Sequence, residues 1–266
     1  MKTSNGTMPC SSPRHALFFP LLAALALLPA AEHASAQDTP PPISTDRPGQ
    51  STSPSVLGPG YIQLEAGAQI AGIAPGTESY ALPSGLARIG LLPAMELRLG
   101  AEYRSLRSTT AASGIASVSA GAKIAVTQEQ GAIPETAFLL TLALPYGSEN
   151  FRPAAVAPSF LLAMRSSLGG PFNLYYNLGG SWDGSNGPGT GLYTLALSAT
   201  IAGNLSAFAE LYGSLASDVL PMHAADAGIA YVLSPDLQLD LSGGAGITPS
   251  APDYFINAGL SLRLRR

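Results

Sequence analysis

Charged residues are scarce in this 266-residue sequence, in which Asp, Glu, Lys and Arg make up 11% of the chain and hydrophobic residues 46%. Soluble globular domains carry roughly 25% charged residues, so the charges here are too few to coat a soluble surface of this size. The formal net charge of −4 argues against nucleic acid as a partner, because binding to phosphates needs a basic surface. A chain this apolar is not expected to be disordered either.

Cysteine and histidine are nearly absent. Cys10 is the only cysteine, so an internal disulfide is excluded, and His223 is the only histidine after residue 36. The stability of the protein must therefore come from hydrogen-bonded sheet and burial, not from the disulfides of small secreted domains. One histidine leaves little for a zinc site, and the Gly-rich stretch 242–246 lies inside a predicted strand. We expect no metal and no cofactor.

Long hydrophobic runs are missing except near the N-terminus. There an apolar run over 16–31 follows basic residues, and small residues at 34–36 offer a cleavage site. This pattern predicts a signal peptide over residues 1–36. A transmembrane anchor would need about 20 apolar residues, whereas this run is shorter and contains Pro20 and Pro29. After it, no stretch is long enough for a membrane-spanning helix.

What the chain does contain is alternation with a period of two from residue 60 onward. Polar residues alternate with apolar ones in 61–70, 94–104, 236–244 and 253–264, as in strands with one polar and one apolar face. A soluble sandwich alternates in the same way. A chain that is exported, apolar and poor in charge is better explained by a β-barrel in an outer membrane, where lipid takes the place of the charged coat.

The spacing of turn residues predicts twelve strands. We expect them over 60–71, 78–90, 94–105, 115–127, 135–144, 155–167, 172–182, 190–202, 205–215, 223–233, 237–247 and 254–264. Even-numbered connections are short and odd-numbered ones longer and polar, except that the fourth, 128–134, is long for its class. Short periplasmic turns and longer external loops are typical of membrane barrels. The predicted fold is all-β, an antiparallel transmembrane barrel over 60–266 in the outer membrane of a Gram-negative bacterium, with both termini periplasmic.

In this barrel the polar faces point into the lumen. The predicted lumen-lining charges, together with Arg88, are Glu65, Glu96, Arg98, Glu102, Arg104, Lys123, Arg165, Glu210, Asp226, Asp240 and Arg263. Either these charges pair across strands and keep the interior hydrated, or they form an electrostatic filter for permeant ions. Their mixed signs favour pairing.

Aromatic residues fall mostly near the ends of predicted strands. They are Tyr61, Tyr103, Tyr146, Tyr175, Tyr176, Tyr193, Tyr231, Tyr254 and Phe255. Such positions are typical of the interfacial girdles of membrane proteins. A stacking route for aromatic solutes is the alternative interpretation.

The sequence offers one candidate for catalysis. Outer-membrane lipases and deacylases are barrels with a Ser–His pair, and here the general base could only be His223, oriented by Asp226. Asp226 lies three residues away, so a regular strand puts the two side chains on opposite faces. We therefore predict no catalytic residue.

A Pro/Ser/Thr-rich lead-in over 37–59 precedes the first strand and contains the adjacent residues Thr45, Asp46, Arg47 and Pro48. We expect this clasp at the periplasmic mouth. Asp46 and Arg47 cannot pair well with each other in extended chain, so each is predicted to find an opposite charge on the barrel wall. The lead-in is then a docked segment that narrows or plugs the lower lumen. A solvated tail is the alternative.

The stretch STDRPGQSTSPSVLGPGYIQLEAG (44–67) and the terminal DYFINAGLSLRL (253–264) resemble an outer-membrane family named for the meta-pathway of phenol degradation. The resemblance implies a barrel that passes small hydrophobic or aromatic solutes. It also implies that the clasp, Gln63 and Glu65 are the structural signature. The barrel assembly machinery is an expected partner. In one departure from the usual pattern of barrel proteins, the chain ends on Arg266 and not on an aromatic residue.

The functional hypothesis is passive passage of small solutes through a barrel surrounded by outer-membrane lipids. A closed barrel with a structural or surface-interaction role is the second hypothesis, and an outer-membrane lipid-modifying enzyme is the third. A barrel of this size can hold either a narrow channel or a packed interior.

Overall fold

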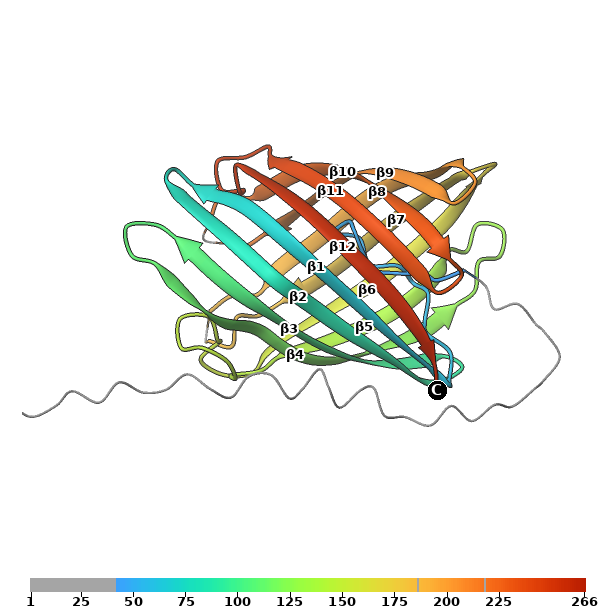
Figure 1. The fold of residues 1–266 in the computed structure, drawn as a ribbon, viewed down its shortest axis with the longest axis horizontal. Helices are drawn as coiled ribbons and strands as arrows, with labels where there is room; N and C mark the ends of the chain where they lie inside the picture. Colours follow the sequence, from blue (N-terminus) through green and yellow to red (C-terminus); the bar gives the residue numbers. More distant parts are fainter. Residues whose placement is uncertain (1–41, 186, 218) are drawn as a thin grey trace, which may run out of the picture. The chain divides into compact units, whose positions relative to one another are not determined.

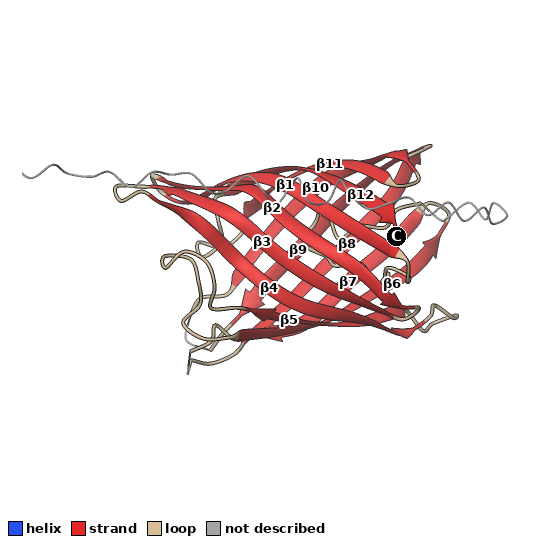
Figure 2. Ribbon diagram, turned by 60° about the horizontal axis from the view of Figure 1, so that its bottom comes forward, coloured by secondary structure: helices blue, strands red, loops and turns tan. Residues whose placement is uncertain are grey.

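The computed structural model describes residues 42–185, 187–217 and 219–266. Over these residues the chain forms twelve antiparallel strands that close into a barrel (Figures 1 and 2). The strands are β1 (Tyr61–Ala74), β2 (Thr77–Leu92), β3 (Met95–Arg107), β4 (Ala112–Thr127), β5 (Glu135–Ala143), β6 (Ala157–Gly169), β7 (Phe172–Ser181), β8 (Thr190–Ala202), β9 (Leu205–Leu215), β10 (Met222–Ser234), β11 (Leu237–Gly246) and β12 (Tyr254–Arg265). The predicted fold class is confirmed. The predicted signal peptide (1–36) and residues 37–41 of the lead-in lie outside the described residues.

Each strand pairs with its neighbours in sequence, and the barrel closes between the first and last strands. β1 and β12 are in continuous register from Tyr61↔Arg265 to Gly72↔Tyr254. Closure leaves no unpaired strand edge, which is the condition for a sheet to span a bilayer. In the described part of the chain, no helix is long and apolar enough to cross a membrane.

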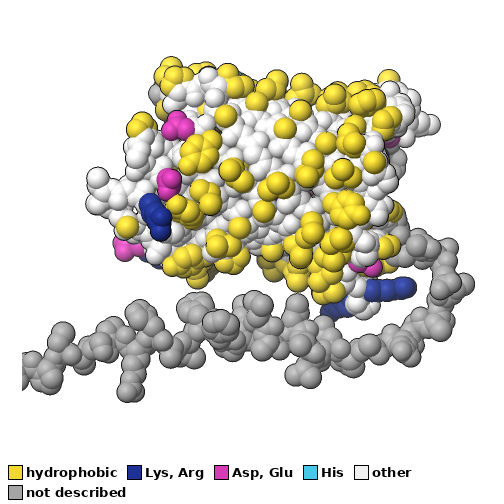
Figure 3. Space-filling model, turned by 45° about the horizontal axis from the view of Figure 1, so that its top comes forward, with side chains coloured by type: hydrophobic (Ala, Val, Ile, Leu, Met, Phe, Trp, Pro, Cys, Tyr) yellow, Lys and Arg dark blue, Asp and Glu magenta, His cyan; other side chains and the backbone are white. Residues whose placement is uncertain are grey.

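Side-chain alternation gives the wall two chemically different faces. On β3, the outward Leu97 and Leu99 are 38% and 52% exposed, whereas Glu96 of the same strand points inward and is fully buried. Figure 3 shows hydrophobic side chains spread over the visible outer wall, with charged side chains near its two ends. An apolar outer belt flanked by polar ends matches the polarity profile of a lipid bilayer.

At the end of the barrel where β1 begins and β12 ends, most connections between strands are short. There β2–β3, β6–β7, β8–β9 and β10–β11 are joined by two residues each, and the longer 128–134 connection contains the isolated bridge Gln130↔Ile133. At the other end, 144–156 and 182–189 are long. The first connection is an exception that the sequence analysis missed. β1 and β2 pair as far as Ala74↔Thr77, because Gly76 adopts a φ of +72° that allows a two-residue hairpin turn.

Residues 42–58, here called the lumen segment, run inside the barrel before β1 begins. Ile43 N donates to Pro235 O at 2.8 Å, in the turn between β10 and β11. Further along, the backbone of Gly58 lies directly against Gly90 of β2. Between these two points the lumen segment is hydrogen-bonded to inward side chains of β1–β4, β7–β9, β11 and β12. It therefore crosses the lumen.

Candidate functional site

Asp46 of the lumen segment is the centre of a buried charge cluster. Its carboxylate accepts hydrogen bonds from Arg98 Nη1 at 2.5 Å, Lys123 Nζ at 3.0 Å and Ser53 N at 3.1 Å. Its backbone N–H donates to Glu65 Oε2 at 3.1 Å. Burial by itself would raise the pKa of Asp46, but the adjacent Lys123 and Arg98 cations outweigh it and hold that pKa well below its usual range.

Arg88 of β2 connects the other carboxylates of this cluster. It donates from Nε and Nη2 to Glu96 at 2.9 and 2.8 Å and from Nη1 to Glu65 at 3.0 Å. The same guanidinium donates to the Ser44 and Ser55 carbonyl oxygens at 3.0 Å. Buried charges are tolerated only when they are paired and hydrogen-bonded. The lumen segment therefore supplies carbonyl acceptors for Arg88 that the barrel wall does not provide.

Arg47 extends to a different part of the wall. Its Nη2 lies 3.0 Å from Asp240 Oδ1 and 2.9 Å from Asn257 Oδ1. Its guanidinium lies on Gly67 and Gly259, which face each other in the β1–β12 register, and a Cβ on either glycine would overlap it. These glycines are midway along their strands. The clasp thus lies deeper in the barrel than the expected position at the periplasmic mouth, because the lumen segment rises into the lumen before it returns to β1.

The lumen segment is anchored to the opposite wall by neutral and acidic side chains. Ser51 Oγ lies 2.5 Å from Glu210 Oε1 and 2.6 Å from Thr194 Oγ1. Thr52 N donates to Asn177 Oδ1 at 2.7 Å, and Asn177 Nδ2 donates back to Thr52 O at 3.1 Å. The sequence analysis did not select Thr194 and Asn177. Their inward position in the strand pattern was the available signal, but neither carries a charge.

Asp226 of β10 faces Glu210 directly across the β9–β10 register. Asp226 is 6% exposed and Glu210 3%. Both carboxylate oxygens of Asp226 are buried without a hydrogen-bond partner among the described residues. No cation of the described chain forms a salt bridge with either residue. Asp226 is thus held by no hydrogen-bond donor or cation of the described chain, whereas Glu210 accepts hydrogen bonds from the lumen segment.

The other predicted lumen residues also face inward but pair with near neighbours. Arg104 pairs with Glu102 on β3. Arg165 Nη2 lies 2.8 Å from Glu135 Oε2. Arg263 Nε lies 2.7 Å from Asp236 Oδ1, and its guanidinium carbon is 5.3 Å from the centre of the Tyr61 ring. Most of the predicted charges are therefore paired or covered by the lumen segment, and few of them face open space.

The aromatic residues divide between the two faces. Tyr103, Tyr231 and Tyr254 are outward and 46%, 46% and 42% exposed, as an interfacial girdle requires. Tyr61 and Tyr175 line interior cavities, so their assignment to a girdle is wrong. The outward or inward direction follows the residue's place in the strand alternation and not its distance from the strand end.

His223 lies on the outward face, where its Nδ1 is 2.7 Å from the Tyr193 hydroxyl. Asp226, three residues on, points inward, as strand alternation requires. No group of three or more His, Cys, Asp or Glu side chains within the described residues could hold a metal ion.

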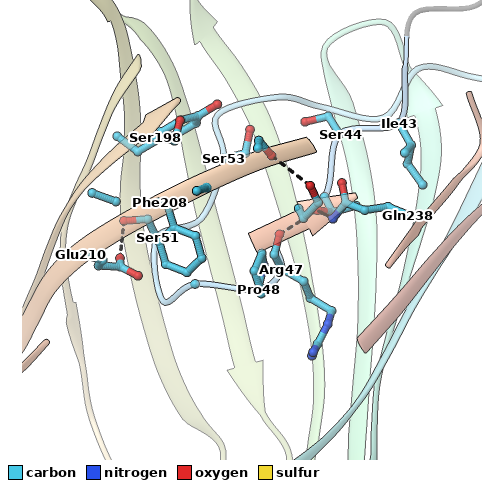
Figure 4. A pocket seen from close by; sticks show the side chains of 17 residues that line it. Ile43, Ser44, Arg47, Pro48, Ser51, Ser53, Ser198, Phe208, Glu210 and Gln238 are labelled. Carbon is cyan, nitrogen blue, oxygen red and sulfur yellow. Dashed lines mark hydrogen bonds between the residues drawn. The ribbon is translucent and has the colours of Figure 1, made fainter. Parts of the chain in front are cut away.

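Several cavities border the lumen segment, among them one of about 440 Å³ beside Tyr61, Arg165 and Arg263. A cavity of about 230 Å³ lies between the segment and the β7–β11 wall, beside Phe208 and Ser198 (Figure 4). Another one, of about 250 Å³, lies on the β1–β4 side, lined by Asp46 and Glu102 among others. The interior is thus partly filled by a segment of the chain and partly open.

These features define a class of protein: a twelve-stranded outer-membrane β-barrel with a polar interior and a segment of its own chain inside. The particular family follows from the sequence. Residues 45–264 match the family model described as "Putative MetA-pathway of phenol degradation", and the chain belongs to this family, as its resemblance predicted.

Solved structures share the fold. An outer-membrane channel from Pseudomonas putida F1 superimposes with a TM-score of 0.65 at 12% identity, over 82% of this chain and 99% of that one. The NanC porin gives a TM-score of 0.51 at 9% identity, over 76% of this chain and 100% of that one. No curated protein sequence matches the chain. At these identities the likeness concerns the fold.

Proposed function

We propose that the protein is a channel of the Gram-negative outer membrane that passes small solutes passively, and that the lumen segment sets the width of the passage. The observation that carries this proposal is the way the interior is filled. A solid barrel would pack its interior with wall side chains, whereas here a separate segment occupies the lumen and leaves cavities of about 230 and 250 Å³ on its two sides.

The contacts of the lumen segment support its role as a constriction. It is held by ion pairs and hydrogen bonds such as Arg98–Asp46 at 2.5 Å and Arg47–Asp240 at 3.0 Å, and no covalent link fixes it to the wall. Polar contacts of this kind position the segment without sealing the barrel with an apolar core. The lumen-lining residues then act mainly as anchors for the segment.

The family's description and the cavity lining support solutes with an apolar or aromatic part. Phe208 and Tyr175 both line the 230 Å³ cavity. A closed barrel with a structural or surface role is the competing function, and the experiment below separates the two.

Swelling of proteoliposomes in a small sugar tests the proposal. The full chain is expressed with its own leader and extracted from outer membranes, alongside a deletion of residues 42–58. We expect measurable swelling with the intact protein, and faster swelling with a higher solute size limit for the deletion. The double variant Asp46→Ala/Arg47→Ala, which undocks the segment without removing it, should give an intermediate rate.

Heat-dependent mobility on gels establishes that each barrel is folded. Folded protein that gives no swelling above lipid alone, with or without residues 42–58, would replace the channel by the closed structural barrel.

A further inference from the structure

The cavity on the β7–β11 side of the lumen segment has a lining unlike that of the rest of the interior. Its wall side is formed by small or neutral residues of β7–β10, including Tyr175, Ser198, Ser206 and Phe208. Figure 4 shows the Phe208 ring beside Ser51 and Glu210, with Ser198 above them, and Arg47 extending away from the group. One side of the cavity thus offers an aromatic face, and the other offers hydroxyl groups.

The charged groups that line this cavity are already engaged. Arg47 is the only cation among the described residues of the lining, and it is bound to Asp240 and Asn257 at 3.0 and 2.9 Å. Glu210 accepts hydrogen bonds from Gln50 N at 2.7 Å and Ser51 Oγ at 2.5 Å. A solute entering the cavity therefore meets no free cation.

The balance of charge around the cavity is negative. Beside the cavity, Asp226 also points into the lumen and faces Glu210 across the register, and no described cation forms a salt bridge with either carboxyl group. On the opposite wall, by contrast, Arg88, Arg98 and Lys123 are gathered in the cluster around Asp46. These three cations are thus gathered on the side of the lumen away from the cavity.

We propose that this cavity is a selective solute site that admits small uncharged molecules with hydroxyl groups and one apolar face, and that discriminates against anions. The proposal rests on the proposed channel function and names its substrate class. A hydroxyl group of such a solute donates hydrogen bonds to the serine side chains or accepts them. The apolar face of the solute packs on Phe208. An anion loses its water without gaining a cation partner, and it is repelled by the negative charge of the Glu210–Asp226 pair.

The test compares two probes with the same five-carbon skeleton, arabinose and arabinonate, in the proteoliposome swelling assay. Arabinose should enter faster than its anion. In a KCl gradient, the reversal potential of the same protein should show a preference for K⁺ over Cl⁻.

The facing pair Glu210 and Asp226 carries about one negative charge, because two adjacent buried carboxyl groups without a cation share a proton. The variant Glu210→Gln/Asp226→Asn removes this charge and should lower the preference roughly twofold, the effect of one charge about 8 Å away in water. Its matched control removes two carboxylates from the outer loops, Glu149→Gln/Asp183→Asn, and should leave the preference unchanged. Ser198→Lys places a free cation in the cavity and should speed the entry of arabinonate.

The outcomes are separable. If neither probe enters, the channel function itself fails. If arabinonate enters as fast as arabinose, or if Ser198→Lys has no effect on a folded barrel that passes arabinose, the channel stands and the proposed selectivity is overturned.

Discussion

Replacing Asp46 by Asn should release the lumen segment from the wall while the barrel stays folded. Asparagine keeps the shape of the side chain and an oxygen that can accept the Ser53 N–H, which lies 3.1 Å from Asp46 Oδ1. It removes the charge that Arg98 and Lys123 share. The barrel strands retain their own backbone ladder, so the loss falls on the docking of the segment.

The magnitude follows from the partners left behind. Removing one member of a buried ion pair costs about 3–5 kcal/mol. Glu96 remains 2.8 Å from Arg98 Nη1 and 3.9 Å from Lys123 Nζ, so it compensates in part and the lower value applies. A loss of about 3 kcal/mol corresponds to roughly a 100-fold shift in the docking equilibrium.

Thiol labelling measures this shift. With Cys10 replaced by Ser, the variant Ser53→Cys places a thiol at a position that is 7% exposed. Its maleimide labelling rate should rise on the order of 100-fold when Asp46→Asn is added. Gln50→Cys, at an exposed position of the same segment, should be labelled rapidly in both backgrounds. Equal labelling of Ser53→Cys with and without Asp46→Asn would refute the role of this carboxylate in holding the segment.

Three further results are expected. Gly259→Ala should displace the Arg47 guanidinium, which lies where the new Cβ would be, weaken docking by roughly 1–3 kcal/mol and speed the same labelling; the control Gly85→Ala, whose Cβ would meet Ala101 O at 3.7 Å, should not. Asp226→Asn should change the stability of the barrel by less than about 1 kcal/mol at neutral pH, because Asp226 and Glu210 face each other and two such buried carboxyl groups share one proton, so asparagine replaces a side chain that is already neutral; a large shift of the midpoint in urea unfolding would contradict this. Since the pKa of Asp46 is lowered by docking, its contribution is complete above the undocked value of about 3.9 and declines progressively as the pH falls from there toward the lower pKa of the docked state. Conductance should therefore be constant from neutral pH to about 4.5 and rise below about 3.9, and a variant lacking the carboxylate should not show this rise.

The strands could be predicted because their signal is local. β8 and β9 begin and end where the alternation and the Gly203–Asn204 turn place them. The ends of β1 and β2 could not be placed, because whether residues 72–78 continue the ladder depends on pairing such as Gly72↔Glu78. The polar-to-apolar pattern on each side of the turn does not reveal that pairing.

The site could be predicted only as a set of inward charges and a docked clasp. Which charge meets which depends on the register around a closed barrel. Asp46 meets Lys123, 77 positions away in the sequence, and Arg47 meets Asp240, 193 positions away. Neutral partners such as Asn177 carry no sign that distinguishes them from other polar residues of the lumen. The alternation within one strand therefore shows on which face of the sheet a side chain lies, but not which residue it contacts.

Single-channel conductance in a planar bilayer tests the central claim most directly, namely that the lumen segment constricts an open barrel. The protein is compared with and without residues 42–58, after heat-dependent gel mobility has shown that both barrels are folded. The account predicts discrete conductance steps for the intact chain and larger steps after the deletion. Steps of the same size for both proteins would contradict the constriction, and the absence of steps from both would contradict the channel itself.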